Sequence, residues 1–209
     1  LMLTVLLTRL DKAGLAGAEP FAGVPGTVGG AVVMNAGTTL GEAKDLVCSV
    51  DLVMPDGTLR AWSADELAFR YRHAEIPEGA VVARARLQLS DENVAERRAS
   101  RQELLQRRKR TQPLDLPSCG STFTNPPGDY AGRLIEAVGL KGRRIGGASI
   151  SAKHANFIVN HGDATAQNIL DLIRLARSAV FAETGVLLTP EVKLLGPWSP
   201  DSFMLESAG

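Results

Sequence analysis

The 209-residue sequence lacks the features of several large protein classes. It has two cysteines, Cys48 and Cys119, which lie far apart and in no metal-binding spacing. It has no uninterrupted apolar run of the roughly 18 residues that a membrane-spanning helix needs. Lysine plus arginine number 23, as do aspartate plus glutamate, so no net charge draws the chain to nucleic acid or to an anionic membrane. These absences predict a reduced, cytoplasmic, monomeric protein with no metal site and no nucleic-acid or membrane partner.

Two common phosphate-binding patterns are also missing. No Gly-Lys-Ser/Thr follows a glycine-rich turn, which excludes a P-loop, and the dinucleotide pattern G-x-G-x-x-G is absent. The sequence contains only three histidines, and no serine stands in G-x-S-x-G, so a serine nucleophile with a histidine base is not favoured.

What the sequence does contain is a glycine-rich run from Gly23 to Gly37, interrupted mainly by small or apolar side chains. Glycine permits positive φ and lets a ligand approach the backbone closely. Successive N–H groups in such a turn can form a concavity that binds an anion. The run is therefore compatible with two structures, a tight turn packed under a sheet or a cradle for a diphosphate.

The rest of the chain predicts an α+β fold in two units. Apolar strands flank Pro55-Asp56-Gly57 as in a hairpin, and residues 81–89 and 186–195 also favour strand. Helices are expected after Asp129 and Thr165, and an arginine-rich helix is expected over 93–110, either solvated or holding an anion at its end. We expect one unit over residues 1–92, a basic helical bridge over 93–112, a second unit over 113–198 and a loose tail over 199–209.

Four side chains could carry chemistry, and each also has an ordinary structural explanation. Ser121 follows Gly120 in a loop with little steric cover, where most serines only cap or turn. The planar guanidinium of Arg72 is suited to binding a carboxylate, but Arg72 could also be an ordinary surface residue. Glu191 stands in an apolar segment, where partial desolvation would keep a proton available, or it faces water. His154 leads into a buried strand and could line a pocket mouth, or it simply belongs to the start of that strand.

Seven segments in order resemble the UDP-N-acetylenolpyruvoylglucosamine reductase family of bacterial cell-wall synthesis. The segments cover most of the chain. A single such motif would be weak evidence for the family, but seven motifs in the family's order are strong evidence. The segments are Gly23 to Gly37, Tyr71-Arg72-His73, Gly120 to Pro126, Leu140-Lys141-Gly142, Ile145 to Ala148, Lys153 to Asn160, and Pro190-Glu191-Val192.

The resemblance implies a fold and a cofactor. The fold would be α+β, with part of a vanillyl-alcohol-oxidase-type (PCMH-type) FAD-binding domain followed by the family's α+β substrate-binding domain. The glycine-rich run would hold the FAD diphosphate, through Gly23, Val24, Pro25, Gly26, Thr27, Gly29, Gly30, Asn35, Ala36 and Gly37.

The resemblance also implies a reaction in peptidoglycan precursor synthesis. NADPH reduces the flavin, a hydride then goes to C3 of the enolpyruvyl ether of UDP-N-acetylglucosamine enolpyruvate, and a proton goes to C2, giving UDP-N-acetylmuramate. Ser121 matches the proton donor, and Arg72 and Glu191 match the residues that polarise the substrate carboxylate. Asn125 and His154 match substrate contacts.

The resemblance has limits within the sequence. No inserted loop follows Asn125-Pro126, so the chain is similar to the short form of the family. Nothing before residue 13 resembles the family's further FAD-contacting loop, which predicts an N-terminally truncated chain that holds FAD weakly. Two alternatives stay open: another FAD-dependent oxidase or dehydrogenase of the same flavin-domain superfamily, or a non-catalytic UDP-sugar-binding module.

Overall fold

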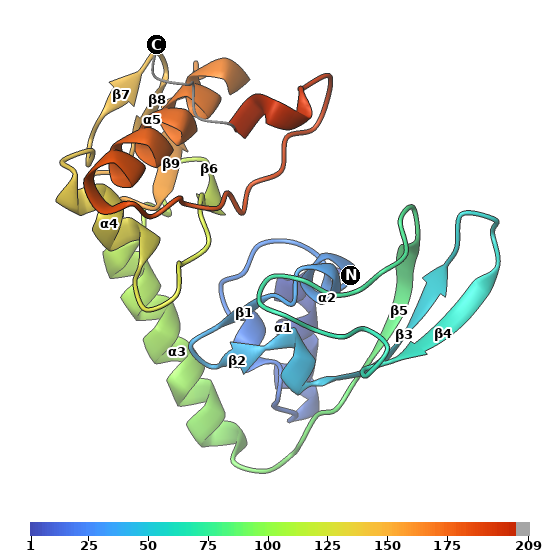
Figure 1. The fold of residues 1–209 in the computed structure, drawn as a ribbon. Helices are drawn as coiled ribbons and strands as arrows, with labels where there is room; N and C mark the ends of the chain where they lie inside the picture. Colours follow the sequence, from blue (N-terminus) through green and yellow to red (C-terminus); the bar gives the residue numbers. More distant parts are fainter. Residues whose placement is uncertain (204–209) are drawn as a thin grey trace. The chain divides into compact units, whose positions relative to one another are not determined.

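The computed structural model describes residues 1–203 and divides the chain into two compact units, Leu1–Arg108 and Lys109–Gly209 (Figure 1). Each unit has its own hydrophobic core and its own antiparallel sheet, and each mixes helices with strands. The predicted α+β class is therefore confirmed.

The sheet of the first unit has the strand order β4-β3-β5 (Figure 1). The central strand β3 (Val47–Val53) pairs antiparallel with β4 (Leu59–Ser63) and β5 (Val81–Leu87). The predicted hairpin turn is present, and the Asp56 carboxylate accepts from the Thr58 backbone N at 2.9 Å. A register irregularity between Val47 and Ser49 lets Val47 join Val50 and Leu52 in the core.

Short elements carry the glycine-rich run beside this sheet. Helix α1 (Leu3–Ala13) ends at Gly14, which has left-handed φ, and α2 (Val28–Val33) packs against β5. A two-stranded sheet of β1 (Gly37–Thr38) and β2 (Gly41–Glu42) follows at once. Single 3-10 turns, Glu19–Phe21 and Ala43–Asp45, complete the unit and bury Phe21 and Ala43.

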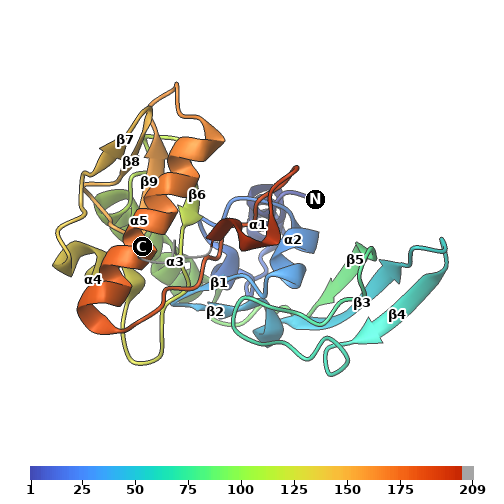
Figure 2. The same ribbon diagram turned by 45° about the horizontal axis from the view of Figure 1, so that its top comes forward.

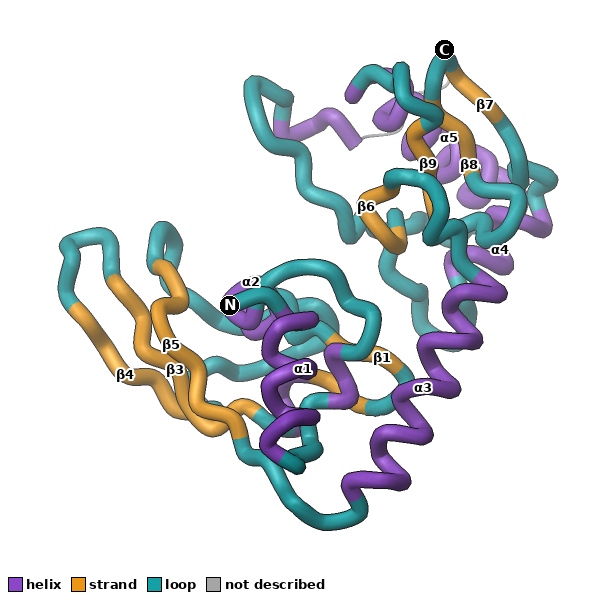
Figure 3. Tube along the Cα trace, turned by 180° about the vertical axis from the view of Figure 1, so that it is seen from behind, coloured by secondary structure: helices purple, strands orange, loops and turns teal. Residues whose placement is uncertain are grey.

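The arginine-rich helix α3 (Val94–Thr111) is anchored to the first unit rather than fully solvated. Figure 3 shows it passing beside α1, where Arg98 and Arg101 reach the Asp11 carboxylate at 3.0 and 2.6 Å. Nearer its C-terminal end, Arg108 donates to the Ala22 carbonyl at 3.2 Å. Most residues of α3 stay exposed, as expected for a charged helix face, while these arginines pair with groups of the same unit.

The second unit is a four-stranded antiparallel sheet with a long helix across it. The strand order is β6-β9-β8-β7, from β6 (Ser118–Ser121), β9 (Phe157–Asn160), β8 (Ala148–Ile150) and β7 (Arg144–Ile145). Helix α5 (Ala166–Thr184) packs against β7 and β8, and the shorter α4 (Ala131–Ala137) packs against α5 (Figure 2). As predicted, Thr165 caps α5 and Gly185 ends it in a left-handed conformation.

Two local predictions in this unit are wrong. Asp129 does not cap α4, because its carboxylate accepts from the Tyr130 backbone N at 2.7 Å and pairs with Arg133. Residues 186–195 form no regular strand, because their described pairing is limited to an isolated bridge between Phe123 and Pro190. Of the predicted tail, Pro200–Phe203 form a 3-10 turn against α5, and residues 204–209 lie outside the described chain.

Candidate functional site

Part of the glycine-rich run is required by the fold itself. Gly23 and Gly26 have φ of +69° and +123°, which side-chain-bearing residues rarely adopt. A Cβ on Gly37 would lie 2.3 Å from the Gly41 carbonyl oxygen, so the closeness of β1 and β2 demands glycine there. These three glycines would be expected in this fold with or without a ligand.

Gly29 and Gly30 have no such structural explanation. Both lie in the first turn of α2 without positive φ. A Cβ on Gly29 would meet the Val82 carbonyl at 3.5 Å, and one on Gly30 would meet Thr27 Oγ1 at 3.4 Å, so both would fit. Glycine in a helix costs about 1 kcal/mol relative to alanine. The fold itself therefore does not require glycine at either position.

Asn35 ties the end of the glycine-rich run to the rest of the first unit. The residue is fully buried, and its Nδ2 donates to Glu42 Oε2 and to the Arg70 carbonyl, both at 3.0 Å. Its Oδ1 accepts from the Lys44 backbone N at 3.0 Å. The side-chain amide is thus occupied inside the protein, so any contact of this position with a cofactor falls to its backbone.

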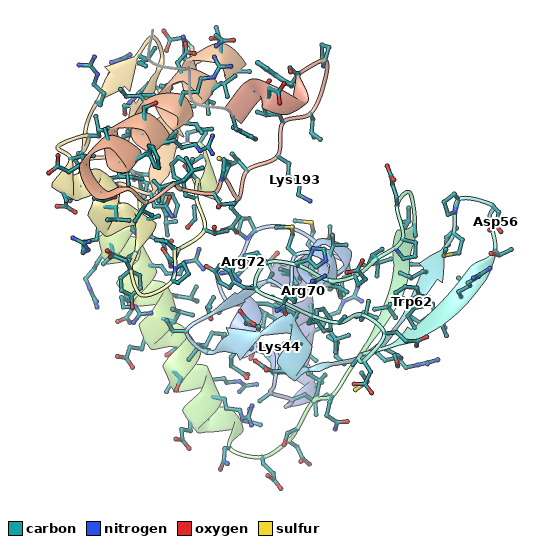
Figure 4. All side chains as sticks on the ribbon, viewed as in Figure 1. Lys44, Asp56, Trp62, Arg70, Arg72 and Lys193 are labelled. Atoms are coloured by element: carbon teal, nitrogen blue, oxygen red, sulfur yellow. The ribbon has the colours of Figure 1, made fainter. Side chains whose placement is uncertain are left out.

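Arg72 is held against the same run by a strained turn. Arg70 and His73 exchange two backbone hydrogen bonds, which leaves Arg72 at the second turn position with φ of +55°. Its guanidinium donates to the carbonyls of Asn35 and Gly37 at 3.4 and 3.5 Å and lies 3.9 Å from the Glu42 carboxylate. A left-handed arginine costs about 1 kcal/mol or more, and such outliers concentrate at functional sites. Figure 4 shows Arg72 beside Arg70 and Lys44.

In the second unit, backbone pairing brings Ser121 and Glu191 together. Ser121 ends β6 opposite Phe157, and the next residue, Thr122, accepts at its carbonyl from the Glu191 backbone N at 2.9 Å. Both candidate side chains are half-buried. Partial burial, with the nearby Glu191 carboxylate, raises the pKa of the Cys119 thiol, which places that carboxylate near β6.

The two predicted substrate contacts lie in the same part of the second unit. Asn125 Oδ1 accepts from the Ala131 backbone N at 3.1 Å, so it caps α4 where Asp129 was expected to. His154 is half-buried, and its ring meets that of Phe157 edge-on with centroids 4.9 Å apart. Burial lowers the pKa of His154, and the Lys141 cation lowers it further, which favours a neutral imidazole.

Sequence reasoning missed Asn156, the residue that links these groups. Its side chain is 4% exposed and binds both backbone groups of Phe123, accepting from its N at 2.9 Å and donating to its carbonyl at 2.8 Å. The signal in the sequence is one amide inside the apolar segment from Ala155 to Val159. A polar side chain in such a segment needs a buried partner.

Thr122 offers a stability prediction for this segment. Its hydroxyl is buried and has no hydrogen-bond partner among residues 1–203, and an unsatisfied buried polar group costs about 1–3 kcal/mol. Thr122→Val has nearly the same shape, so we expect it to raise the free energy of unfolding by about 1 kcal/mol. Chemical denaturation of both proteins measures this, and a Thr122→Val protein that is less stable than the parent would contradict it.

Comparison with known proteins decides the family. Residues 2–63 match the FAD binding domain, and residues 112–195 match the C-terminal domain of UDP-N-acetylenolpyruvoylglucosamine reductase. The crystal structure of the reductase from Thermus caldophilus superimposes with a TM-score of 0.83 at 41% identity, covering 92% of this chain and 69% of that one. The chain belongs to the UDP-N-acetylenolpyruvoylglucosamine reductase family. The resemblance found in the sequence is thereby confirmed.

Two sequence relatives define how much of such a reductase the chain spans. The reductase of Anaeromyxobacter dehalogenans strain 2CP-C is 53% identical over 196 residues, which are 94% of this chain and 59% of the relative. The reductase of Moorella thermoacetica is 46% identical over 195 residues, 93% of this chain and 65% of the relative. The chain thus spans about three fifths of the length of these curated reductases. Among the described residues, no helix is long and apolar enough to cross a membrane.

Proposed function

We propose that this chain takes part in the NADPH-dependent, FAD-dependent reduction of UDP-N-acetylglucosamine enolpyruvate to UDP-N-acetylmuramate. The observation that carries the proposal is the backbone bond from Glu191 to Thr122, which ties Glu191 to the residue that directly follows Ser121. These are the residue types that supply a proton and polarise a carboxylate. The proposal places the protein in the cytoplasm as a monomer, in the synthesis of peptidoglycan precursors.

Each unit has its own part in the proposal. Residues 1–92 would form part of the FAD-binding domain, with the glycine-rich run from Gly23 to Gly37 holding the diphosphate. The lack of side chains at Gly29 and Gly30 supports the diphosphate site, because neither the φ angles nor the packing of these two residues requires glycine. FAD, when bound, would supply the hydride that NADPH provides. Residues 113–198 would bind the nucleotide sugar, and residues 93–112 would connect the two.

Ser121 would donate the proton to C2 of the enolpyruvyl group. A serine hydroxyl is a poor acid in water, but the carbanion-enolate formed at C2 is strongly basic, so an aligned transfer runs downhill. Ser121 is half-buried at the end of β6, where its backbone is fixed by pairing with Phe157. This fixed placement supplies the alignment that a weak acid needs.

Arg72 and Glu191 would polarise the carboxylate of the enolpyruvyl group. Negative charge grows on that carboxylate as the C2–C3 double bond is reduced, so fixed positive charge and a hydrogen-bond donor stabilise the transition state more than the ground state. Glu191 can donate a hydrogen bond to that carboxylate only in its protonated form. Asn125, through its Nδ2, and His154 would contact the rest of the substrate.

Two glycine variants test the cofactor site. Gly29→Ala and Gly30→Ala place a methyl group where the fold leaves room, so we expect unchanged or slightly raised thermal stability, because alanine favours helix by about 1 kcal/mol. The same methyl group should keep the diphosphate from the backbone and raise the Kd for FAD at least about tenfold, which is about 1.4 kcal/mol.

Fluorescence titration with FAD measures this affinity, and Val33→Ala, an exposed change on the same helix, serves as the control. Both glycine variants binding FAD within twofold of the parent chain would contradict the site. So would a folded parent chain that binds no FAD.

The function itself is tested by NADPH oxidation. The chain supplied with FAD should oxidise NADPH rapidly only when UDP-N-acetylglucosamine enolpyruvate is present. A folded, FAD-bound protein that ignores this substrate would contradict the proposal. Calorimetry that shows binding of the UDP-sugar without FAD would favour a non-catalytic binding module, and flavin that stays with the acid-precipitated protein would favour a covalent flavin oxidase.

A further inference from the structure

Asn156 stands at the meeting point of the candidate site groups of the second unit. Its carbonyl accepts from the Thr122 backbone N at 2.8 Å, and its side chain makes the two bonds to Phe123. Its backbone N donates to His154 Nδ1 at 3.2 Å. Four hydrogen bonds from one buried residue therefore join the segment that follows Ser121 to His154.

We propose that Asn156 is a positioning residue that fixes Ser121 and His154 for substrate reduction. The inference rests on the proposed function and deepens it, because Asn156 touches neither reacting atom and acts through its neighbours. The residue is assigned this part by its contacts with Thr122, Phe123 and His154.

The two side-chain bonds from Asn156 to Phe123 take the place of the backbone bonds that a neighbouring strand would make. Phe123 is 2% exposed, so its backbone N–H and carbonyl cannot turn to water. The Asn156 amide presents one acceptor and one donor in the spacing that a neighbouring strand would offer. Each of these groups would destabilise the folded segment if it were left unpaired. The amide thus holds the chain two residues beyond Ser121 in one place.

The opposite side of the same segment carries Glu191. Thr122 accepts from the Glu191 backbone N at 2.9 Å, and Thr124 donates to the Thr189 carbonyl at 3.0 Å. A shift of Phe123 would therefore move Ser121 and Glu191 together. Displacement of a reacting group by about 1 Å can cost roughly 100-fold in rate.

The bond to His154 sets the proton position on its ring. Because Nδ1 accepts from a backbone N–H, the neutral imidazole carries its proton on Nε2. Burial and the Lys141 cation lower the pKa of His154, while Glu136 opposes them, so the ring is neutral near neutral pH. His154 thus offers the substrate a donor at Nε2 rather than an acceptor.

One substitution made at two places, in the turn just before β9 and at the end of β9, tests the inference. Asn156→Asp keeps the acceptor for the Phe123 N–H but sets an oxygen against the Phe123 carbonyl. Asn160→Asp is the matched control, because among the described residues the Asn160 side chain bonds only through Oδ1, which accepts from the backbone N of Gly162 and Ala164 at 2.7 and 3.1 Å. Asn156→Ala provides a second variant that adds no charge.

Hydrogen exchange of the chain without cofactor gives the first readout. We expect the amides of residues 121–124 to exchange at least about tenfold faster in both Asn156 variants, and at the parent rate in Asn160→Asp. ¹⁵N spectra of the histidine rings should show the Nε2–H form of His154 in the parent chain. Unchanged exchange, or an Nδ1–H ring, would overturn the inference.

The two half-reactions of the FAD-bound protein give the second readout. In the Asn156 variants we expect NADPH to reduce the flavin within about twofold of the parent rate, while reoxidation by the enolpyruvyl substrate slows about 10- to 100-fold. Equal losses in both steps would mean a merely structural residue. If the parent itself shows no substrate-dependent step, the proposed function fails, while the exchange result still decides whether Asn156 holds the segment.

Discussion

Ser121→Ala is expected to stop reduction of the enolpyruvyl substrate while NADPH still reduces the bound flavin. The variant removes the hydroxyl that we propose protonates C2, and loss of a general acid costs roughly 10²–10⁴-fold. The backbone is unaffected, because Ser121 pairs with Phe157 through main-chain atoms. Stopped-flow absorbance of the flavin separates the steps: reduction should keep its rate and reoxidation by substrate should fall by at least about 100-fold.

Ser118→Ala is the matched control for this experiment. Ser118 lies on the same strand, is exposed, and pairs with Val159 at the other end of β6. Both half-reactions of this variant should keep the parent rates. A Ser121→Ala protein that turns over within about threefold of the parent would show that another group protonates C2.

Arg72→Lys is expected to lower kcat/KM for the enolpyruvyl substrate by roughly 10²–10³-fold, the loss typical of one donor that stabilises a developing anion. Lysine keeps the charge but loses the planar fork that matches a carboxylate. Unfolding is measured beside the kinetics, because the Arg72 guanidinium also donates to the carbonyls of Asn35 and Gly37 at 3.4 and 3.5 Å. Steady-state kinetics with calorimetric unfolding would measure both effects.

Arg70→Lys tests whether the arginine at position 72 is special. Arg70 lies two residues away, pairs with Glu75 at 2.6 Å and has a side chain that is 67% exposed. Its replacement should leave kcat/KM within about twofold, because an exposed ion pair contributes little. Equal losses in the two variants would mean that general positive charge, and not the orientation of Arg72, acts on the substrate.

Local chemistry in the sequence predicted several elements well. The hairpin and α5 follow from a few neighbouring residues, because turns and helix caps depend on short-range contacts. These are the turn at Pro55-Asp56-Gly57 and the caps at Thr165 and Gly185. The prediction that Asp129 caps α4 was wrong, because Asn125, six residues before Ala131, caps this helix instead. The strand predicted over residues 186–195 was also wrong. An apolar run predicts burial, whereas a regular strand depends on a pairing partner elsewhere in the chain.

The candidate site shows the same division. By itself, the sequence determined which residue types are present and in which order, and the order of seven motifs was enough to indicate the family and to single out Ser121, Arg72 and Glu191. Only the tertiary structure decided that Gly29 and Gly30 are not required by the fold, and that Asn156 joins Phe123 to His154. Room for a Cβ and bonds between residues 33 positions apart depend on how distant segments pack, which no local pattern records.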